Sequence, residues 1–400
     1  MKICVISENK YGCGASIAAY RLAEALSKAG HNIQYLYCNE HETPSDPNFK
    51  MQHISRSLLE SVTYVIMSKI DKKAAFDILR ERFYGKIKDI IDDFQPDIIN
   101  LHNVGTILRH KDITKLGMDY PIIWTMHDCF AVKPFVYRFK DYYGKINTVY
   151  LLDKSMLNQF ERNQLIESNS NIQFVTPSKW LYDSIQDVIN GNKKVHIIPN
   201  GISQYEWFPQ NKESCRKDLN LNQNDFYCLF VANRIFYERK NIRVLLESLE
   251  MLDDLPITAL ALGKKDKSYE IYSKKIKYFT PDFKSDTINK LFSAADVFII
   301  PSLIDNLPNV VLESLFCGTP VIGADTGGIP EMVIPRKTGW LFDPRNPKEL
   351  AKLISEIYRN KEEIKEFSKN CMLLSSDKFT AEKQVKTYIE LFMNTIANDT

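Results

Sequence analysis

Short apolar runs alternate with longer amphipathic stretches along most of the chain. In the first half, the apolar runs predict strands at 2–7, 33–37, 97–101, 121–125, 172–176 and 195–199. The amphipathic stretches between them predict helices at 15–29, 57–69, 76–94, 151–168 and 178–190. Alternating strands and helices are typical of an α/β domain, in which helices flank a largely parallel sheet.

The pattern pauses near residue 200 and then starts again. Pro199-Asn200-Gly201 is a turn-forming cluster, and the polar stretch 210–217 follows it. Beyond this point, strands are expected at 226–232, 257–262, 275–279, 296–300 and 320–323. Helices are expected at 241–252, 285–294, 308–317, 347–359 and 380–396. The 400 residues therefore predict two α/β domains, 1–200 and 201–379, since one domain usually takes roughly 100–200 residues.

The composition, with 44% hydrophobic and 26% charged residues, is typical of a water-soluble globular protein. A net charge of +2 argues against a dedicated nucleic-acid binder, which usually carries a clear basic excess. The eight cysteines form no CxxC pair and no metal-finger spacing, which predicts reduced thiols, several of them in the core. The N-terminal apolar run is too short for a signal peptide, and no run reaches the roughly 20 residues that cross a bilayer. We therefore expect a cytoplasmic protein.

The segment 301–320 is the most informative part of the chain. It follows the apolar run 297–300, and it continues through a polar loop into a helix expected from Pro308 to Gly318. Asp305 lies on the loop and Glu313 on the helix, with seven residues between them. Carboxylates that bind sugar hydroxyls beside a helix N-terminus, which favours a phosphate, indicate a nucleotide-sugar site.

This segment resembles the signature of family 4 glycosyltransferases, which are retaining enzymes of the GT-B fold. The signature has two acidic residues separated by seven others and a Cys-Gly-Thr-Pro-Val stretch, here 317–321, and the family's next loop matches 326–331. The resemblance implies two Rossmann-like domains that face each other across a cleft, with helix 380–396 crossing back to the first domain. Asp305 stands where the family usually has Glu, and Asn309 stands where Gly is common. The run Asp-Asn-Leu-Pro-Asn resembles members that act on bacterial exopolysaccharide, capsule and O-antigen chains.

The resemblance assigns the donor-binding residues to the second domain. Arg234 and Lys240 resemble the family's cations that flank the donor diphosphate, where negative charge builds as the sugar–phosphate bond breaks. Asp305 would bind a hydroxyl of the donor sugar, and Glu313 would bind the ribose of the nucleotide. The other expected contacts with the nucleotide-sugar are Asn309, Val310, Thr326, Gly327 and Gly328.

The first domain offers fewer candidates. Gly12 and Gly14, in the loop after the first strand, would let the backbone approach a ligand at a helix N-terminus, although a tight turn explains them equally well. His127 follows the strand 121–125, where the family often has a His that contacts the donor sugar, whereas His102 is as well explained as a structural residue.

Two segments of the first domain are candidates for other contacts. The basic and aromatic segment 133–143 could stack on acceptor sugars or be a packed loop. The segment 68–94 is a candidate for membrane contact, although amphipathic helices more often face a core.

The leading interpretation is a retaining, metal-independent hexosyltransferase. It would move a sugar from a UDP- or GDP-sugar to a saccharide acceptor, lipid-linked, in the synthesis of a bacterial surface polysaccharide. The chain has no Asp-x-Asp triplet, so we predict no metal and no cofactor, and the nucleotide-sugar is a substrate. Peripheral contact with the inner membrane face stays open. A sugar-nucleotide epimerase of the same fold and a non-catalytic nucleotide-sugar-binding subunit are the alternatives.

Overall fold

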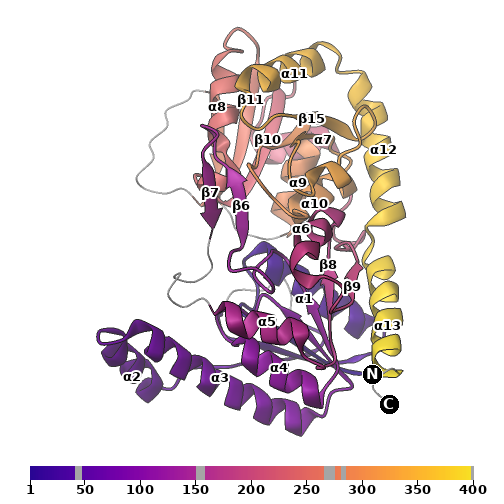
Figure 1. Ribbon diagram of the computed structural model, residues 1–400. Coiled ribbons are helices and arrows are strands. Elements are labelled where there is room, and N and C mark those ends of the chain that lie inside the picture. Colours follow the sequence, from indigo (N-terminus) through magenta and orange to yellow (C-terminus); the bar gives the residue numbers. More distant parts are fainter. Residues whose placement is uncertain (41–46, 150–157, 265–274, 281–284, 398–400) are drawn as a thin grey trace. The chain divides into compact units, whose positions relative to one another are not determined.

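The computed structural model describes residues 1–40, 47–149, 158–264, 275–280 and 285–397 (Figure 1). The contacts of the chain divide it into two compact units. The first unit comprises Met1–Arg138, Thr148–Pro199 and Glu382–Thr400, and the second comprises Phe139–Asn147 and Asn200–Ala381. Each unit is built on its own parallel sheet, and each is described separately below.

The first unit contains a seven-stranded sheet with the order β3-β2-β1-β4-β5-β8-β9, in which every pairing is parallel. Its strands are β1 (Lys2–Ser7), β2 (Asn32–Tyr37), β3 (Lys50–His53), β4 (Ile98–His102), β5 (Ile122–Thr125), β8 (Ile172–Thr176) and β9 (Val195–Ile197). The order of the strands along the chain reverses between β1 and β4. That reversal is the topological switch point of the first sheet.

Helices cover both faces of this sheet. They are α1 (Gly14–Lys28), α2 (Leu58–Ser68), α3 (Lys72–Phe94), α4 (His110–Asp119), α5 (Gln159–Glu167), α6 (Lys179–Ile189) and α13 (Ala381–Ala397). Among them α2 is the exception, since it packs on α3 away from the strands (Figure 1). Side chains of β1 alternate between two apolar clusters: Ile3 and Val5 belong to one, and Cys4 and Ile6 belong to the other. A strand that is buried on both sides in this way reads as a continuous apolar run, which is why the sequence pattern reveals it.

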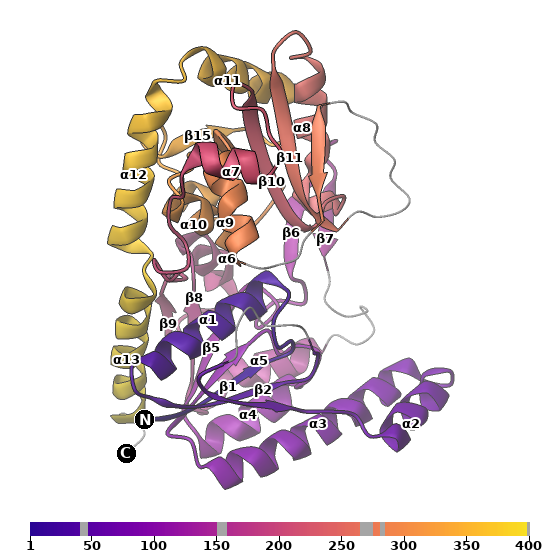
Figure 2. The ribbon, with the colours of Figure 1, turned by 180° about the vertical axis from the view of Figure 1, so that it is seen from behind.

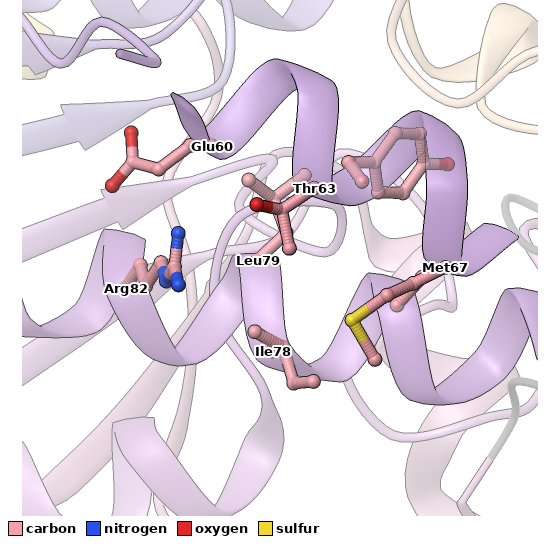
Figure 3. Close-up of a pocket in the computed structure, with 8 residues that line it drawn as sticks. Glu60, Thr63, Met67, Ile78, Leu79 and Arg82 are labelled. Carbon is pink, nitrogen blue, oxygen red and sulfur yellow. The ribbon is translucent and has the colours of Figure 1, made fainter. Parts of the chain in front are cut away.

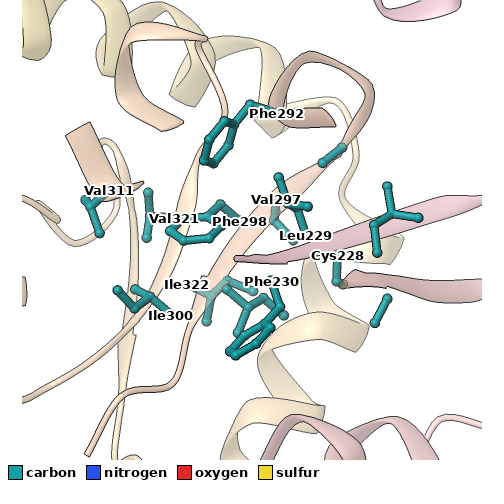
Figure 4. Close-up of a cluster of buried hydrophobic side chains, with 14 of the residues drawn as sticks. Cys228, Leu229, Phe230, Phe292, Val297, Phe298, Ile300, Val311, Val321 and Ile322 are labelled. Carbon is teal, nitrogen blue, oxygen red and sulfur yellow. The ribbon is translucent and has the colours of Figure 1, made fainter. Parts of the chain in front are cut away.

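The second unit contains a six-stranded parallel sheet with the order β12-β11-β10-β13-β14-β15. Its strands are β10 (Phe226–Arg234), β11 (Ile257–Lys264), β12 (Ile276–Phe279), β13 (Val297–Ile300), β14 (Val321–Ala324) and β15 (Gly339–Phe342). Here the order reverses between β10 and β13. Phe230, Phe298 and Ile322 lie in the apolar core around these strands (Figure 4).

The helices of the second unit include two short 3-10 turns. The helical segments are α7 (Lys212–Asp218), η2 (Glu238–Lys240), α8 (Ile242–Glu250), α9 (Ser285–Ala294), α10 (Asn309–Phe316), η3 (Ile329–Glu331), α11 (Pro347–Arg359) and α12 (Glu363–Lys378). Among the described residues of the whole chain, no helix is both long and apolar enough to cross a membrane. All eight cysteines are free thiols.

The structure contains elements that the sequence pattern did not predict. They are β3, α4, a hairpin of β6 (Tyr137–Lys140) and β7 (Ile146–Val149), α7, β15 and α12. The polar stretch 210–217, for which no helix was expected, folds largely into α7, whose start is capped by Asn211 Oδ1 accepting from Ser214 N at 2.9 Å. Residues 151–157 of the expected helix 151–168 lie outside the described residues, and α5 covers 159–167.

The segment 133–143 leads into this hairpin, and the hairpin tip belongs to the second unit. Tyr142 packs against the apolar core of that unit, and its hydroxyl donates to Glu247. Tyr143, in contrast, is mostly exposed. Of the two alternatives for the segment 133–143, the structure therefore shows the packed loop at Tyr142.

Candidate functional site

Three loops of the second unit begin at the same edge of its sheet. They follow β10, β13 and β14, and β13 pairs with both of the other strands. The switch point between β10 and β13 lies among them. In open α/β sheets, ligands bind at such a point, outside the carboxyl ends of the strands. These three loops therefore form the candidate donor site.

The carboxylate of Asp305 holds two of these loops together. Its Oδ1 accepts from Arg239 Nη1 at 2.7 Å, and its Oδ2 accepts from Lys240 Nζ at 2.6 Å. The Ser302 hydroxyl also donates to Oδ2, at 3.0 Å. The exposed fractions of the three charged side chains are only 15% for Arg239, 20% for Lys240 and 10% for Asp305. We call Arg239, Lys240 and Asp305 the Asp305 cluster.

The Asp305 cluster carries a net positive charge, because two cations surround one carboxylate. Burial acts to raise the pKa of Asp305, but Arg239 and Lys240 outweigh burial and hold this pKa well below its usual range. Burial lowers the pKa of Lys240, and Asp305 opposes that shift. An anion beside these cations would meet a fixed and poorly solvated positive charge, where electrostatic attraction is stronger than in water.

The loop after β14 lies against the backbone of Asp305. Gly328 N donates to Asp305 O at 3.0 Å, and the Thr326 hydroxyl donates to Leu303 O at 3.2 Å. Gly327 has a φ of +60°, and a Cβ at this position would stand 1.9 Å from Asp305 O. Only glycine fits such a close approach in the left-handed region. The structure thus brings the predicted residues 326–328 and Asp305 together.

The N-terminus of α10 forms the next part of the site. Asn309 is its first residue and Val310 its second, and the cap residue Pro308 offers no side-chain hydrogen bond. Asn200 Nδ2, from the turn-forming cluster, donates to Asn309 Oδ1 at 3.0 Å. This contact gives Asn309 a structural role that a glycine could not fill. Glu313 lies one turn further along α10 and is 6% exposed.

The sequence did not identify Arg239 as a site residue. Arg234, the predicted partner of Lys240, is the exposed last residue of β10, whereas Arg239 occupies the second cationic position beside Asp305. Asn241 holds this turn in place with a φ of 53°, and its Nδ2 donates to Pro301 O at 3.0 Å. An Arg-Lys-Asn run at a strand-to-helix turn was the available signal, although adjacent cations usually indicate a solvated surface.

In the first unit, Gly12 lies in the loop that joins β1 to α1 and Gly14 begins α1, beside the switch point of that sheet. Gly12 has a φ of +96°, which favours glycine. Gly14 is the first residue of α1, and a Cβ there would meet nothing within 4 Å. Packing therefore does not require glycine at position 14, and the open space at the start of α1 is compatible with a ligand.

His127 is supported by a chain of polar contacts through neighbouring strands. His127 Nε2 and His102 Nδ1 lie 3.0 Å apart, and His102 Nε2 lies 2.7 Å from Asn100 Oδ1. Asn100 Nδ2 donates to Thr125 Oγ1 at 3.0 Å, and Thr125 Oγ1 lies 2.9 Å from the hydroxyl of Tyr388 on α13. His102, whose role the sequence left open, is thus the residue that orients His127.

These contacts fix the tautomers of both rings. Asn100 Oδ1 can only accept, so His102 Nε2 carries the proton and its Nδ1 accepts from His127 Nε2. Burial lowers the pKa of His127 to about 4, and burial together with His127 lowers the pKa of His102 well below its usual range. His127 is therefore a neutral ring whose Nδ1 accepts hydrogen bonds.

No group of three His, Cys, Asp or Glu residues that could hold a metal ion occurs within the described ranges.

Two family models match the chain, and together they span most of it. The model for Glycosyltransferase Family 4 matches residues 13–204, and the model for Glycosyl transferases group 1 matches residues 211–393. An uncharacterised glycosyltransferase of Methanocaldococcus jannaschii is 24% identical over 364 residues, which are 84% of this chain and 83% of that protein.

Solved structures resemble the whole chain at low sequence identity. Sucrose-phosphate synthase from Thermosynechococcus elongatus matches with a TM-score of 0.75 and 18% identity, and the match covers 99% of both chains. HepE of Anabaena, solved in complex with UDP-glucose, matches with a TM-score of 0.68 and 14% identity over 98% of this chain and 100% of that one. These likenesses confirm the expected GT-B fold with two Rossmann-like units.

His127 should titrate with a pKa of about 4, against roughly 6.5 for an exposed imidazole. NMR of labelled histidines should show this ring neutral at pH about 6, with its proton on Nε2. Because the folded pKa lies below the unfolded one, this group stabilises the fold fully above pH about 6.5, and the contribution is lost as the pH falls toward the folded pKa. A His127 resonance that titrates near the ordinary value would contradict the contacts described.

Gly327→Ala should destabilise the protein by about 1–3 kcal/mol or more, because the residue would be strained at positive φ and its Cβ would overlap the Asp305 carbonyl. Urea unfolding monitored by circular dichroism measures the loss. Gly85→Ala is the control, since a Cβ there meets nothing within 4 Å and the position is inside α3. That variant should be neutral or more stable by about 0.5–1 kcal/mol. Equal stabilities of the two variants would refute the close approach.

Proposed function

Because this chain is a glycosyltransferase of the family 4 type with the GT-B fold, we propose that it is a retaining enzyme with a UDP- or GDP-sugar as donor. The observation that carries the proposal is the Asp305 cluster at the switch point of the second sheet. It gathers two partly buried cations beside the N-terminus of α10 and the turn 326–328. All three features favour an anion, and the donor supplies one in its diphosphate.

The cations of the Asp305 cluster would act on the leaving group. When the bond between the sugar C1 and the phosphate oxygen breaks, its electron pair stays on the diphosphate. Arg239 and Lys240 would stabilise that added charge, with Arg binding in a fork and Lys as a point charge. Arg234, the exposed last residue of β10, would add a further cation. Because the ion pairs already hold the cations in place, little reorganisation is needed during the reaction.

The acceptor hydroxyl would attack C1 on the face from which the diphosphate departs. A new C1–O bond forms, the C1–phosphate bond breaks, and the hydroxyl proton passes to a diphosphate oxygen. This route retains the configuration at C1 and requires no enzymic nucleophile. No divalent metal is required either, since the Asp305 cluster and the helix N-terminus supply the positive charge.

The remaining candidate residues would position the donor. Asp305 Oδ1 accepts one hydrogen bond from Arg239, and a carboxylate oxygen has room for about two, so it could also accept a sugar hydroxyl. Glu313 would bind the ribose, and Asn309, Val310 and the turn 326–328 would line the diphosphate. In the first unit, His127 Nδ1 would accept a hydrogen bond from a hydroxyl of the donor sugar. Gly12 and Gly14 would let the ligand approach the backbone closely at the start of α1.

We propose that the acceptor is a lipid-linked saccharide and that the enzyme takes part in the synthesis of a bacterial surface polysaccharide. The Asp-Asn-Leu-Pro-Asn run of the donor loop supports this assignment. Such an enzyme would work in the cytoplasm at the inner face of the membrane.

Nucleotide release from a panel of UDP-, GDP- and dTDP-sugars, with EDTA present throughout, tests the proposal. UDP-glucose is the first donor to try, since HepE was solved with it. Release of one nucleotide should persist under EDTA, and Lys240→Ala or Arg239→Ala should reduce kcat by about 10²–10³-fold. Lys352→Ala, which removes a cation that is 76% exposed on α11, should leave the rate unchanged.

The other outcomes separate the alternatives. A changed sugar that stays attached to its nucleotide, formed without acceptor, would identify an epimerase. Donor binding without turnover, even with lipid-linked oligosaccharides, would identify a binding subunit. Activity that disappears under EDTA and returns with a divalent cation would contradict the metal-independent mechanism.

A further inference from the structure

The outer side of helix α2 is apolar and exposed. Its apolar residues have exposed fractions between 47% and 83%, and Ile70, just beyond the helix, is 85% exposed. At roughly 100° per residue, the helical ones fall within an arc of about 120°. We call this set the α2 face: Leu58, Leu59, Val62, Val65, Ile66 and Ile70. A contiguous apolar patch of this kind usually marks an interaction surface.

The opposite side of α2 already holds the helix to its own unit. Glu60, Thr63 and Met67 point toward Leu79 and Arg82 of α3 and line a crevice between the two helices (Figure 3). None of these α2 residues belongs to the α2 face. The α2 face is therefore not needed to attach α2 to α3, and its apolar character requires another explanation.

Polar contacts fix α2 in its position. Ser57 and Glu60 form a capping box, in which Glu60 N donates to Ser57 Oγ at 3.2 Å and Ser57 N donates to Glu60 Oε2 at 2.6 Å. Lys86 Nζ of α3 reaches the same Glu60 Oε2 at 2.8 Å. Within the first unit, α2 lies at the end of α3 that is remote from the sheet, in both views (Figures 1 and 2). The α2 face thus lies on a helix that these contacts hold against α3, away from the sheet.

Cations stand at both ends of the α2 face. Arg56 precedes the helix, with its guanidinium over the rings of Tyr64 and Phe83. Lys69 follows the helix, and Lys72 and Lys73 begin α3; all of these cations are exposed. The two carboxylates of the segment 55–73 are engaged in helix caps: Glu60 as above, and Asp71 Oδ1 by accepting from Ala74 N at 2.9 Å. An apolar helix face flanked by exposed cations complements a lipid surface with negative headgroups. If two copies of the chain docked through this face, their cations would come close together and repel each other.

We propose that the α2 face docks onto an anionic lipid bilayer, with its apolar side chains in the interfacial layer and its cations among the headgroups. The inference deepens the proposed function, because a lipid-linked acceptor would be found at such a surface. Docking itself needs neither donor nor acceptor, so its test is independent of the activity.

Vesicle flotation of the full chain, without substrate, tests the α2 face. The protein should float with phosphatidylcholine vesicles that contain phosphatidylglycerol, and less with phosphatidylcholine alone or at high salt. Leu59→Glu together with Ile66→Glu should weaken binding by roughly tenfold or more. Lys69→Gln with Lys72→Gln should weaken binding to the anionic vesicles and reduce its dependence on salt.

Leu373→Glu with Met393→Glu is the matched control, because these residues of α12 and α13 are 67% and 60% exposed and the change in charge is the same. This variant should float like the wild type. Circular dichroism checks the fold of every variant, and nucleotide release reports on the proposed function separately. Wild type that does not float, or an α2-face variant that floats equally well, overturns the proposal. If the wild type does not float but forms a dimer, and if the α2-face variant alone is monomeric, the face would be assigned to contact with a second copy of the chain.

Discussion

The ion pairs of Asp305 with Arg239 and Lys240 are the interaction on which the second unit's site depends. Two cations this close together and this poorly hydrated would repel each other without the carboxylate between them. Removing one partner from a buried ion pair typically costs about 3–5 kcal/mol, because a charge is left uncompensated. The backbone of the same residue also fixes the loop geometry, since the main-chain carbonyl of Asp305 accepts from Gly328 N and excludes any Cβ at Gly327. The cluster is at once an electrostatic and a geometric constraint.

Both units place their candidate residues by the same rule of chain topology. In each sheet the strand order reverses once near the middle, between β1 and β4 or between β10 and β13, and the candidate loops follow those strands and their neighbours. In the first unit, however, the polar groups form a neutral relay from Tyr388 to His127 and not an ion cluster. The two units therefore offer different chemistry: hydrogen-bond acceptance in the first and fixed positive charge in the second.

Much of this organisation could be predicted from the sequence, because its signals are local. Strands that are buried on both faces are apolar runs, and Asp305, Glu313 and the turn 326–328 belong to one short motif. The pairing of Arg239 with Asp305 spans 66 positions, and that of Tyr142 with Glu247 spans 105, so no local pattern could reveal either. Helix α12 escaped prediction because Ile364, Phe367 and Cys371 are its few buried apolar residues in a polar stretch. The sequence thus revealed the residues of the local motif, whereas the residues that contact them from distant parts of the chain could be found only from the fold.

The most direct test of the diphosphate clamp compares the affinities of UDP and uridine, and of GDP and guanosine, for the wild type and for Lys240→Met, by isothermal titration calorimetry. In the wild type, the diphosphate should strengthen binding over the nucleoside alone. In Lys240→Met that advantage should shrink by about 10–100-fold, the value of one charge-assisted hydrogen bond, while nucleoside affinity stays the same. An unchanged diphosphate advantage in the variant would contradict the account, because the Asp305 cluster would then not hold the donor's phosphates.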